Sequence, residues 1–115
     1  MDNIDYIANN ISELAVLMAL AEEASELSKA AMKLARAKGL LDNPTPISVA
    51  QAEAGLIEEY NDLLNCVTIL DKVSGLALKD DFALRPSKYL RWVERIKNYK
   101  TKLEENHGRG KEKAD

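Results

Sequence analysis

The sequence has little of what disulfides, histidine-based metal sites and nucleic-acid surfaces require. Its 115 residues include one cysteine, Cys66, and one histidine, His107. A single cysteine excludes an intrachain disulfide, which favours a reducing compartment. The histidine falls outside the helical patterns of the sequence, so the Glu-x-x-His pairs of a di-iron helical bundle are absent. Acidic residues outnumber basic ones by 19 to 16, and the net charge of −3 argues against general nucleic-acid binding.

Long apolar runs are also absent. None approaches the roughly 18 residues that a membrane span needs, so we expect no membrane segment. The first ten residues, MDNIDYIANN, are polar and acidic, unlike a secretion signal. Together with the lone cysteine, this predicts a cytoplasmic protein. The length predicts one small domain at residues 1–105, and the polar segment NHGRGKEKAD predicts a flexible tail at residues 106–115.

Helical patterns account for most of the remaining chain, and no strand pattern is present. They cover residues 2 to about 38 with a break near residues 9–10, residues 48 to about 74, and roughly residues 87–105. Ser48 and Gln51 form a capping-box pattern, and Ser87 is a candidate cap for the last helix. Residues 76–87 are ambiguous and read as a linker with a helical turn. The predicted fold is all-α, a small bundle of three to four main helices that assembles as a dimer or tetramer because its core is modest.

The stretch LMALAEEASELSKAAM contains acids on an apolar face. At about 100° per residue, Val16, Leu20 and Leu27 all fall within roughly 60° of Glu23. Glu26 lies at the edge of the same stripe, one turn further on. A surface helix normally places its carboxylates opposite the core, so this helix is unusual.

The stretch GLIEEYNDLLNCVTIL repeats the arrangement. Glu59 lies among apolar residues as Glu23 does, and Asp62 lies at the edge of that stripe as Glu26 does. If the two stripes pack together, four carboxylates converge, and two charges about 4 Å apart repel by roughly 4 kcal/mol at an effective dielectric of 20. Either some of these carboxylates are protonated or a cation lies among them. Oxygen ligands without histidine or cysteine suit Mg²⁺, Mn²⁺ or Ca²⁺.

The two acidic motifs, EEASE at residues 22–26 and EEYND at residues 58–62, resemble the EExxE…ExxD signature of the MazG-like all-α nucleoside triphosphate (NTP) pyrophosphohydrolases. That superfamily includes MazG, dimeric dUTPases and phosphoribosyl-ATP pyrophosphohydrolase. The resemblance implies a Mg²⁺-dependent enzyme that hydrolyses an NTP to the monophosphate and diphosphate, as a nucleotide-pool house-cleaning activity. It implies the following roles: Glu23, Glu26, Glu59 and Asp62 as metal ligands, with Glu22 and Glu58 as catalytic groups that orient or deprotonate water.

A basic segment further along the chain is also similar to the superfamily. SKYLRW contains Lys88 and Arg91 in a Lys-aromatic-x-Arg pattern, and Arg95 lies one turn further on. The resemblance implies that these cations hold the substrate phosphates, whereas Lys29 and Lys33 are interpreted as ordinary surface charges. The identity of the nucleobase stays open. The alternative function is a non-enzymatic helical adaptor, which explains the apolar stripes but not the acids at their centres.

Overall fold

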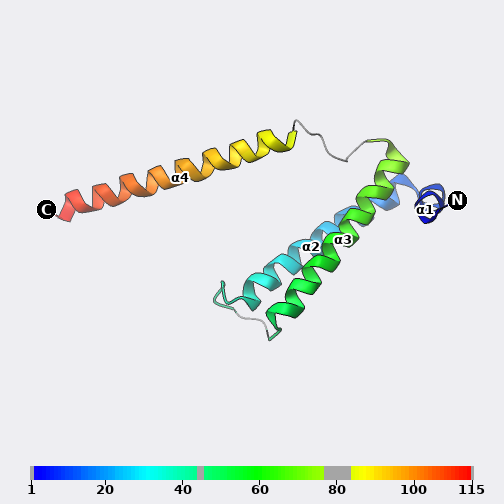
Figure 1. The fold of residues 1–115 in the computed structure, drawn as a ribbon, viewed down its shortest axis with the longest axis horizontal. Helices are drawn as coiled ribbons and strands as arrows, with labels where there is room; N and C mark the ends of the chain where they lie inside the picture. Colours follow the sequence, from blue (N-terminus) through cyan, green and yellow to red (C-terminus); the bar gives the residue numbers. More distant parts are fainter. Residues whose placement is uncertain (1, 44–45, 77–83, 115) are drawn as a thin grey trace. The chain divides into compact units, whose positions relative to one another are not determined.

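A computed structural model describes residues 2–43, 46–76 and 84–114, with side chains described as far as residue 108. Over these residues the chain is all-α, with four helices and no strand, which confirms the predicted class (Figure 1). The chain divides into two compact units, Met1–Lys79 and Asp80–Asp115. The first contains helices α1 to α3 and the second contains α4. Most of the linker predicted at residues 76–87 falls on residues 77–83, which lie outside the described residues.

The first two helices are separated at the predicted break. Helix α1 spans Asn3–Asn10 and is capped by Asp2, whose carboxylate accepts from the backbone N–H of Asp5 at 2.8 Å. Extended backbone at Ile11 ends it, and Ser12 caps helix α2, Glu13–Ala37. The helix axis bends by 114° between α1 and α2. Among the described residues no single helix is long and apolar enough to span a membrane. The bent pair of α1 and α2 reaches the required length and apolar composition only when the two helices are counted together.

Glycines end helices α2 and α3, and the predicted capping box begins α3. Gly39 follows the end of α2 with φ of +71°, a left-handed conformation that glycine adopts without steric penalty. Helix α3, Val49–Ser74, begins with the predicted capping box: Ser48 Oγ accepts from the Gln51 N–H at 3.0 Å, and Gln51 Oε1 accepts from the Ser48 N–H at 3.2 Å. Gly75, with φ of +67°, ends the helix.

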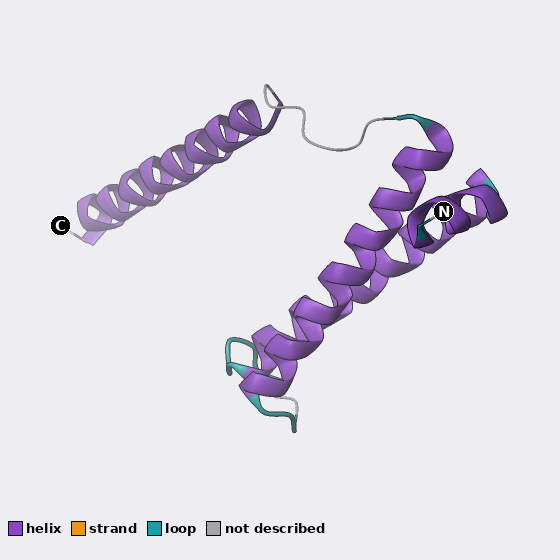
Figure 2. Cartoon of the chain, turned by 45° about the vertical axis from the view of Figure 1, so that its right-hand side comes forward, coloured by secondary structure: helices purple, strands orange, loops and turns teal. Residues whose placement is uncertain are grey.

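Helices α2 and α3 pack side by side in antiparallel directions, and α1 lies across one end of the pair against α3 (Figure 2). The buried core lies at that end, where Val16 of α2 meets Ile69 and Leu70 of α3. Ile11, Leu20 and Val73 pack around these three. At the other end of the pair, Ala52 is buried. The apolar contacts between the helices therefore fix how the middle of α2 faces the middle of α3.

The second unit is the helix α4, Leu84–Ala114. It begins three residues before the predicted start at residue 87, because Pro86 is compatible with a first helical turn, which needs no hydrogen bond from its nitrogen. The prediction of Ser87 as a cap was wrong: its Oγ donates to the Leu84 carbonyl at 2.8 Å from inside the helix. The predicted end near residue 105 was also wrong, since helix-forming Lys, Glu and Ala residues follow the glycines. Flexibility of residues 106–115 stays a prediction.

The core predicts which leucines stabilise the first unit. Leu70 is 1 % exposed, whereas Leu40 is 71 % exposed. We expect Leu70→Ala to lower the free energy of unfolding by about 2–5 kcal/mol, because it leaves a cavity between α2 and α3. Leu40→Ala should change it by at most about 1 kcal/mol. Chemical denaturation followed by circular dichroism measures both, and equal losses for the two variants would contradict this assignment of the core.

Candidate metal centre

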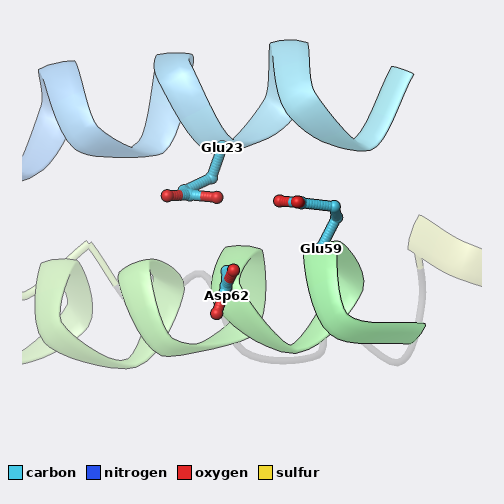
Figure 3. A group of neighbouring side chains, drawn as sticks. All are labelled: Glu23, Glu59 and Asp62. Carbon is cyan, nitrogen blue, oxygen red and sulfur yellow. The ribbon is translucent and has the colours of Figure 1, made fainter. Parts of the chain in front are cut away.

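Three carboxylates from two helices meet in the middle of the α2–α3 pair. Glu23 extends from α2 toward α3, and Glu59 and Asp62 extend from α3 (Figure 3). One oxygen atom of each lies within 4.8 Å of the others, and all three side chains are partly buried. The structure thus brings together three of the four predicted metal ligands.

The convergence follows from helix geometry and from the packing of the two helices. Glu59 and Asp62 are three residues apart, so they lie on the same face of α3. Val16 and Leu20, on the same stripe of α2 as Glu23, contact the core, and this contact turns Glu23 toward α3. The apolar stripes predicted from periodicity are therefore the surfaces that pack, and the acids lie in the seam between them.

The electrostatics of the group favour a bound cation. The pKa of Glu59 is raised, first by its partial burial and then by the negative charges of Asp62, Glu23, Glu26 and Glu58, in that order. Each of these causes makes the ionised form of Glu59 less stable. A divalent cation among the oxygens would reverse the effect by attracting each carboxylate.

The size of the group suits a hard divalent ion. Ligand oxygens on opposite sides of Mg²⁺ lie about 4.2 Å apart, and those around Ca²⁺ lie up to about 5.2 Å apart. The oxygens of Glu23, Glu59 and Asp62, within 4.8 Å of one another, fall inside the Ca²⁺ range and would have to approach one another by up to about 0.6 Å for Mg²⁺. The donors are all carboxylates, which is the chemistry that Mg²⁺ and Mn²⁺ accept.

The other predicted site residues lie outside this group of three. Glu26 is partly buried, and its Oε1 accepts from Lys29 Nζ at 3.4 Å. Its charge nonetheless reaches Glu59, whose pKa it raises. Glu22 and Glu58 are exposed on α2 and α3 beside the group. A metal contact from Glu26 and catalytic roles for Glu22 and Glu58 stay predictions.

The predicted phosphate-binding residues belong to the second unit. Lys88, Arg91 and Arg95 are exposed residues of α4. Their spacing of three and four residues places them along one side of that helix. Their contact with substrate phosphates stays a prediction.

Cys66 of α3 lies near the same acids. It is partly buried, and the pKa of its thiol is raised by that burial first, then by the charges of Glu23 and Asp62. A raised pKa keeps the thiol protonated and unreactive. Glu59 and Cys66 are seven residues apart, so both lie on the apolar stripe of α3 that the sequence periodicity predicts.

The raised pKa of Glu59 gives a pH dependence of stability. Folded protein retains a proton that the unfolded chain has lost, so stability without metal should fall as pH rises from the usual carboxyl range through the raised pKa. Glu59→Gln should escape this loss, and its thermal midpoint should exceed that of the unmodified protein more at pH 7 than at pH 4. At pH 7, Mg²⁺ should raise the thermal midpoint of the unmodified protein, and this increase should be larger than the increase in Glu59→Gln.

Differential scanning fluorimetry with EDTA or with millimolar Mg²⁺ measures these midpoints. Glu53→Gln removes an exposed acid from the first turns of α3 and is the matched control, which should follow the unmodified protein. A Mg²⁺ effect of the same size in Glu59→Gln and in Glu53→Gln would show that Glu59 holds no cation.

Cys66 provides a second measurement at the same site, because it is the one thiol of the sequence. Mg²⁺ bound by Glu23 and Asp62 would offset the two charges that raise the thiol pKa. We expect the midpoint of the pH profile for alkylation by iodoacetamide to move to lower pH when Mg²⁺ replaces EDTA. Glu23→Gln should lower the midpoint in EDTA and reduce its response to Mg²⁺. An unchanged midpoint in the unmodified protein would contradict cation binding beside Cys66.

Comparisons of the chain with known protein families, with characterised proteins and with solved structures found no match. The resemblance of EEASE and EEYND to the MazG-like signature consequently stands on the motif residues alone. Any function assigned to this chain therefore has to be supported by the geometry and electrostatics of its own side chains.

Proposed function

We propose that the chain is a Mg²⁺-dependent nucleoside triphosphate pyrophosphohydrolase of the MazG-like type. The observation that carries the proposal is the convergence of Glu23, Glu59 and Asp62 from two helices into one partly buried group. The same acids occupy the metal-ligand positions of the motifs EEASE and EEYND. A structural role alone gives no reason to place like charges in an apolar seam, where their repulsion destabilises the fold.

The chain's own residues suit each part of this reaction. Glu23, Glu59 and Asp62 would hold the ion, with Glu26 as a fourth ligand. When bound, Mg²⁺ supplies positive charge that neutralises the phosphate oxygens. Glu22 or Glu58 would accept a proton from the attacking water as its oxygen forms a bond to phosphorus.

The α–β anhydride bond breaks in this step, and diphosphate leaves with the bonding electrons. The products are a nucleoside monophosphate and diphosphate. On α4, Lys88, Arg91 and Arg95 are candidate partners for the negative charge that develops on the phosphate oxygens.

The proposed assembly is a homodimer or homotetramer. Two packed helices cover only one face of each, and the first unit exposes large apolar side chains on both. On α2, Leu14 and Met18 are 68 % and 65 % exposed, and on α3, Ile57 and Tyr60 are 62 % and 51 % exposed. A second copy would bury such surfaces. Burial at an interface would also exclude water from the seam and strengthen the electrostatic interactions there.

Diphosphate release from a panel of nucleoside triphosphates tests the proposal. Glu23→Gln, Glu59→Gln and Asp62→Asn should each lower the Mg²⁺-dependent rate at least about 100-fold, because each removes a ligand charge at the ion that stabilises the transition state. Glu53→Gln, an exposed acid outside the group, should retain the rate. Circular dichroism should show equal helix content in all four variants.

The alternative, a non-enzymatic helical adaptor, makes the opposite prediction. It expects neither Mg²⁺ binding in calorimetric titration nor diphosphate release from any nucleotide. Full turnover in any one of the three acid variants would also remove that residue from the proposed metal centre.

A further inference from the structure

A cavity of about 370 Å³ lies between α2 and α3 beside the candidate metal centre. Glu59 belongs both to its lining and to the group of three carboxylates. Glu26 lies at the same end of the cavity lining, one helical turn from Glu23 on α2. Beyond Glu26, the charged residues in the α2 wall are all cations: Lys29, Lys33 and Arg36.

The three cations follow one side of α2. Their spacing of four and then three residues places them in a row that rises about 10 Å along the helix axis. Lys29, nearest the acids, is already paired with Glu26 at 3.4 Å. Over the described residues neither Lys33 nor Arg36 forms an ion pair, and Arg36 is partly buried. The cavity therefore has an acidic end that suits a cation and a basic end that suits an anion.

The opposite wall is shaped by small residues of α3. Gly55 lies in the interior of that helix, where glycine is less favourable than alanine. A Cβ atom added to Gly55 would have no heavy atom within 4 Å, so packing in the first unit does not require glycine there. Gly55 and Ala52 line the cavity, and larger side chains at these positions would reduce its volume.

We propose that this cavity binds the phosphate chain of a polyphosphate ester, with Lys33 and Arg36 contacting the phosphates farthest from the carboxylates. The inference rests on the proposed function and assigns phosphate binding to α2 within the first unit. A phosphate chain with Mg²⁺ at one end needs cations along the rest of its length, and the row on α2 begins beside the metal ligands. The guanidinium of Arg36 can donate two parallel hydrogen bonds to one phosphate group.

Binding of inorganic tripolyphosphate tests the inference without any hydrolysis of a nucleotide. Calorimetric titration in millimolar Mg²⁺ should give an affinity at least tenfold weaker for the double variant Lys33→Gln, Arg36→Gln. Mg²⁺ affinity measured alone should stay within about twofold of the unmodified protein, since neither residue is a ligand. Lys38→Gln is the matched control, because Lys38 follows α2 and does not line the cavity.

Two substitutions at Gly55 separate the shape of the cavity from the stability of the helix. Gly55→Ala should raise the thermal midpoint and retain tripolyphosphate binding, since alanine favours the helix and adds one methyl group. Gly55→Leu should retain helix content yet weaken tripolyphosphate binding at least tenfold by occupying the cavity. Unweakened binding in a folded Gly55→Leu variant would overturn the inference.

The outcomes distinguish the inference from the proposed function. Tripolyphosphate binding that is absent, or equal in the double variant and the unmodified protein, overturns the inference even if Glu23-dependent diphosphate release is observed. Binding that requires Lys33 and Arg36 supports the inference even if no nucleotide is hydrolysed, in which case the proposed reaction fails alone. Weakening of the same size in the control Lys38→Gln would also overturn the assignment to the cavity.

Discussion

The antiparallel contact between α2 and α3 determines the rest of the first unit. Val16, Ile69 and Leu70 bury their side chains at one end of this contact, and Ala52 is buried at the other. Because both helices are regular between these points, the position of every intervening residue follows. The carboxylates of Glu23 and Glu59 face each other as a result of that contact, without a dedicated loop to orient them.

In this arrangement the carboxylates that would bind a metal lower the stability of the metal-free protein. Glu59 lies where burial and neighbouring charges both disfavour its ionised form, whereas a divalent ion requires that form. A neutral side chain there would serve the fold better in the absence of metal. A role in packing therefore does not explain these carboxylates, whereas a role in binding a cation does. A cation site is inferred from the repulsion among these three side chains and not from the number of acids in the sequence.

Sequence periodicity was sufficient for features that depend on one helix at a time. The cap at Ser48, the end of α3 near residue 74 and the placement of Glu23 in an apolar stripe are local features, and the structure confirms them. Features that depend on the packing of two helices were harder to predict from the sequence. Lys33 is exposed, as predicted for a surface charge, but the cavity that it lines was not predicted. That cavity depends on which part of α3 lies opposite α2, and periodicity does not give this register. The start of α4 was predicted three residues too late because Ser87 was taken as the cap of the helix.

The bend between α1 and α2 has a mechanical consequence for the pair of long helices. Since α1 crosses α3 at the core end, three helices meet there, whereas among the described residues of the first unit only α2 and α3 pack together over the carboxylates (Figure 2). Two packed helices separate most readily where the fewest apolar side chains are buried between them. Local opening of the first unit should therefore occur mainly at the acids and the neighbouring cavity. A cation bound by carboxylates of both helices would hold α2 and α3 together there and slow their separation.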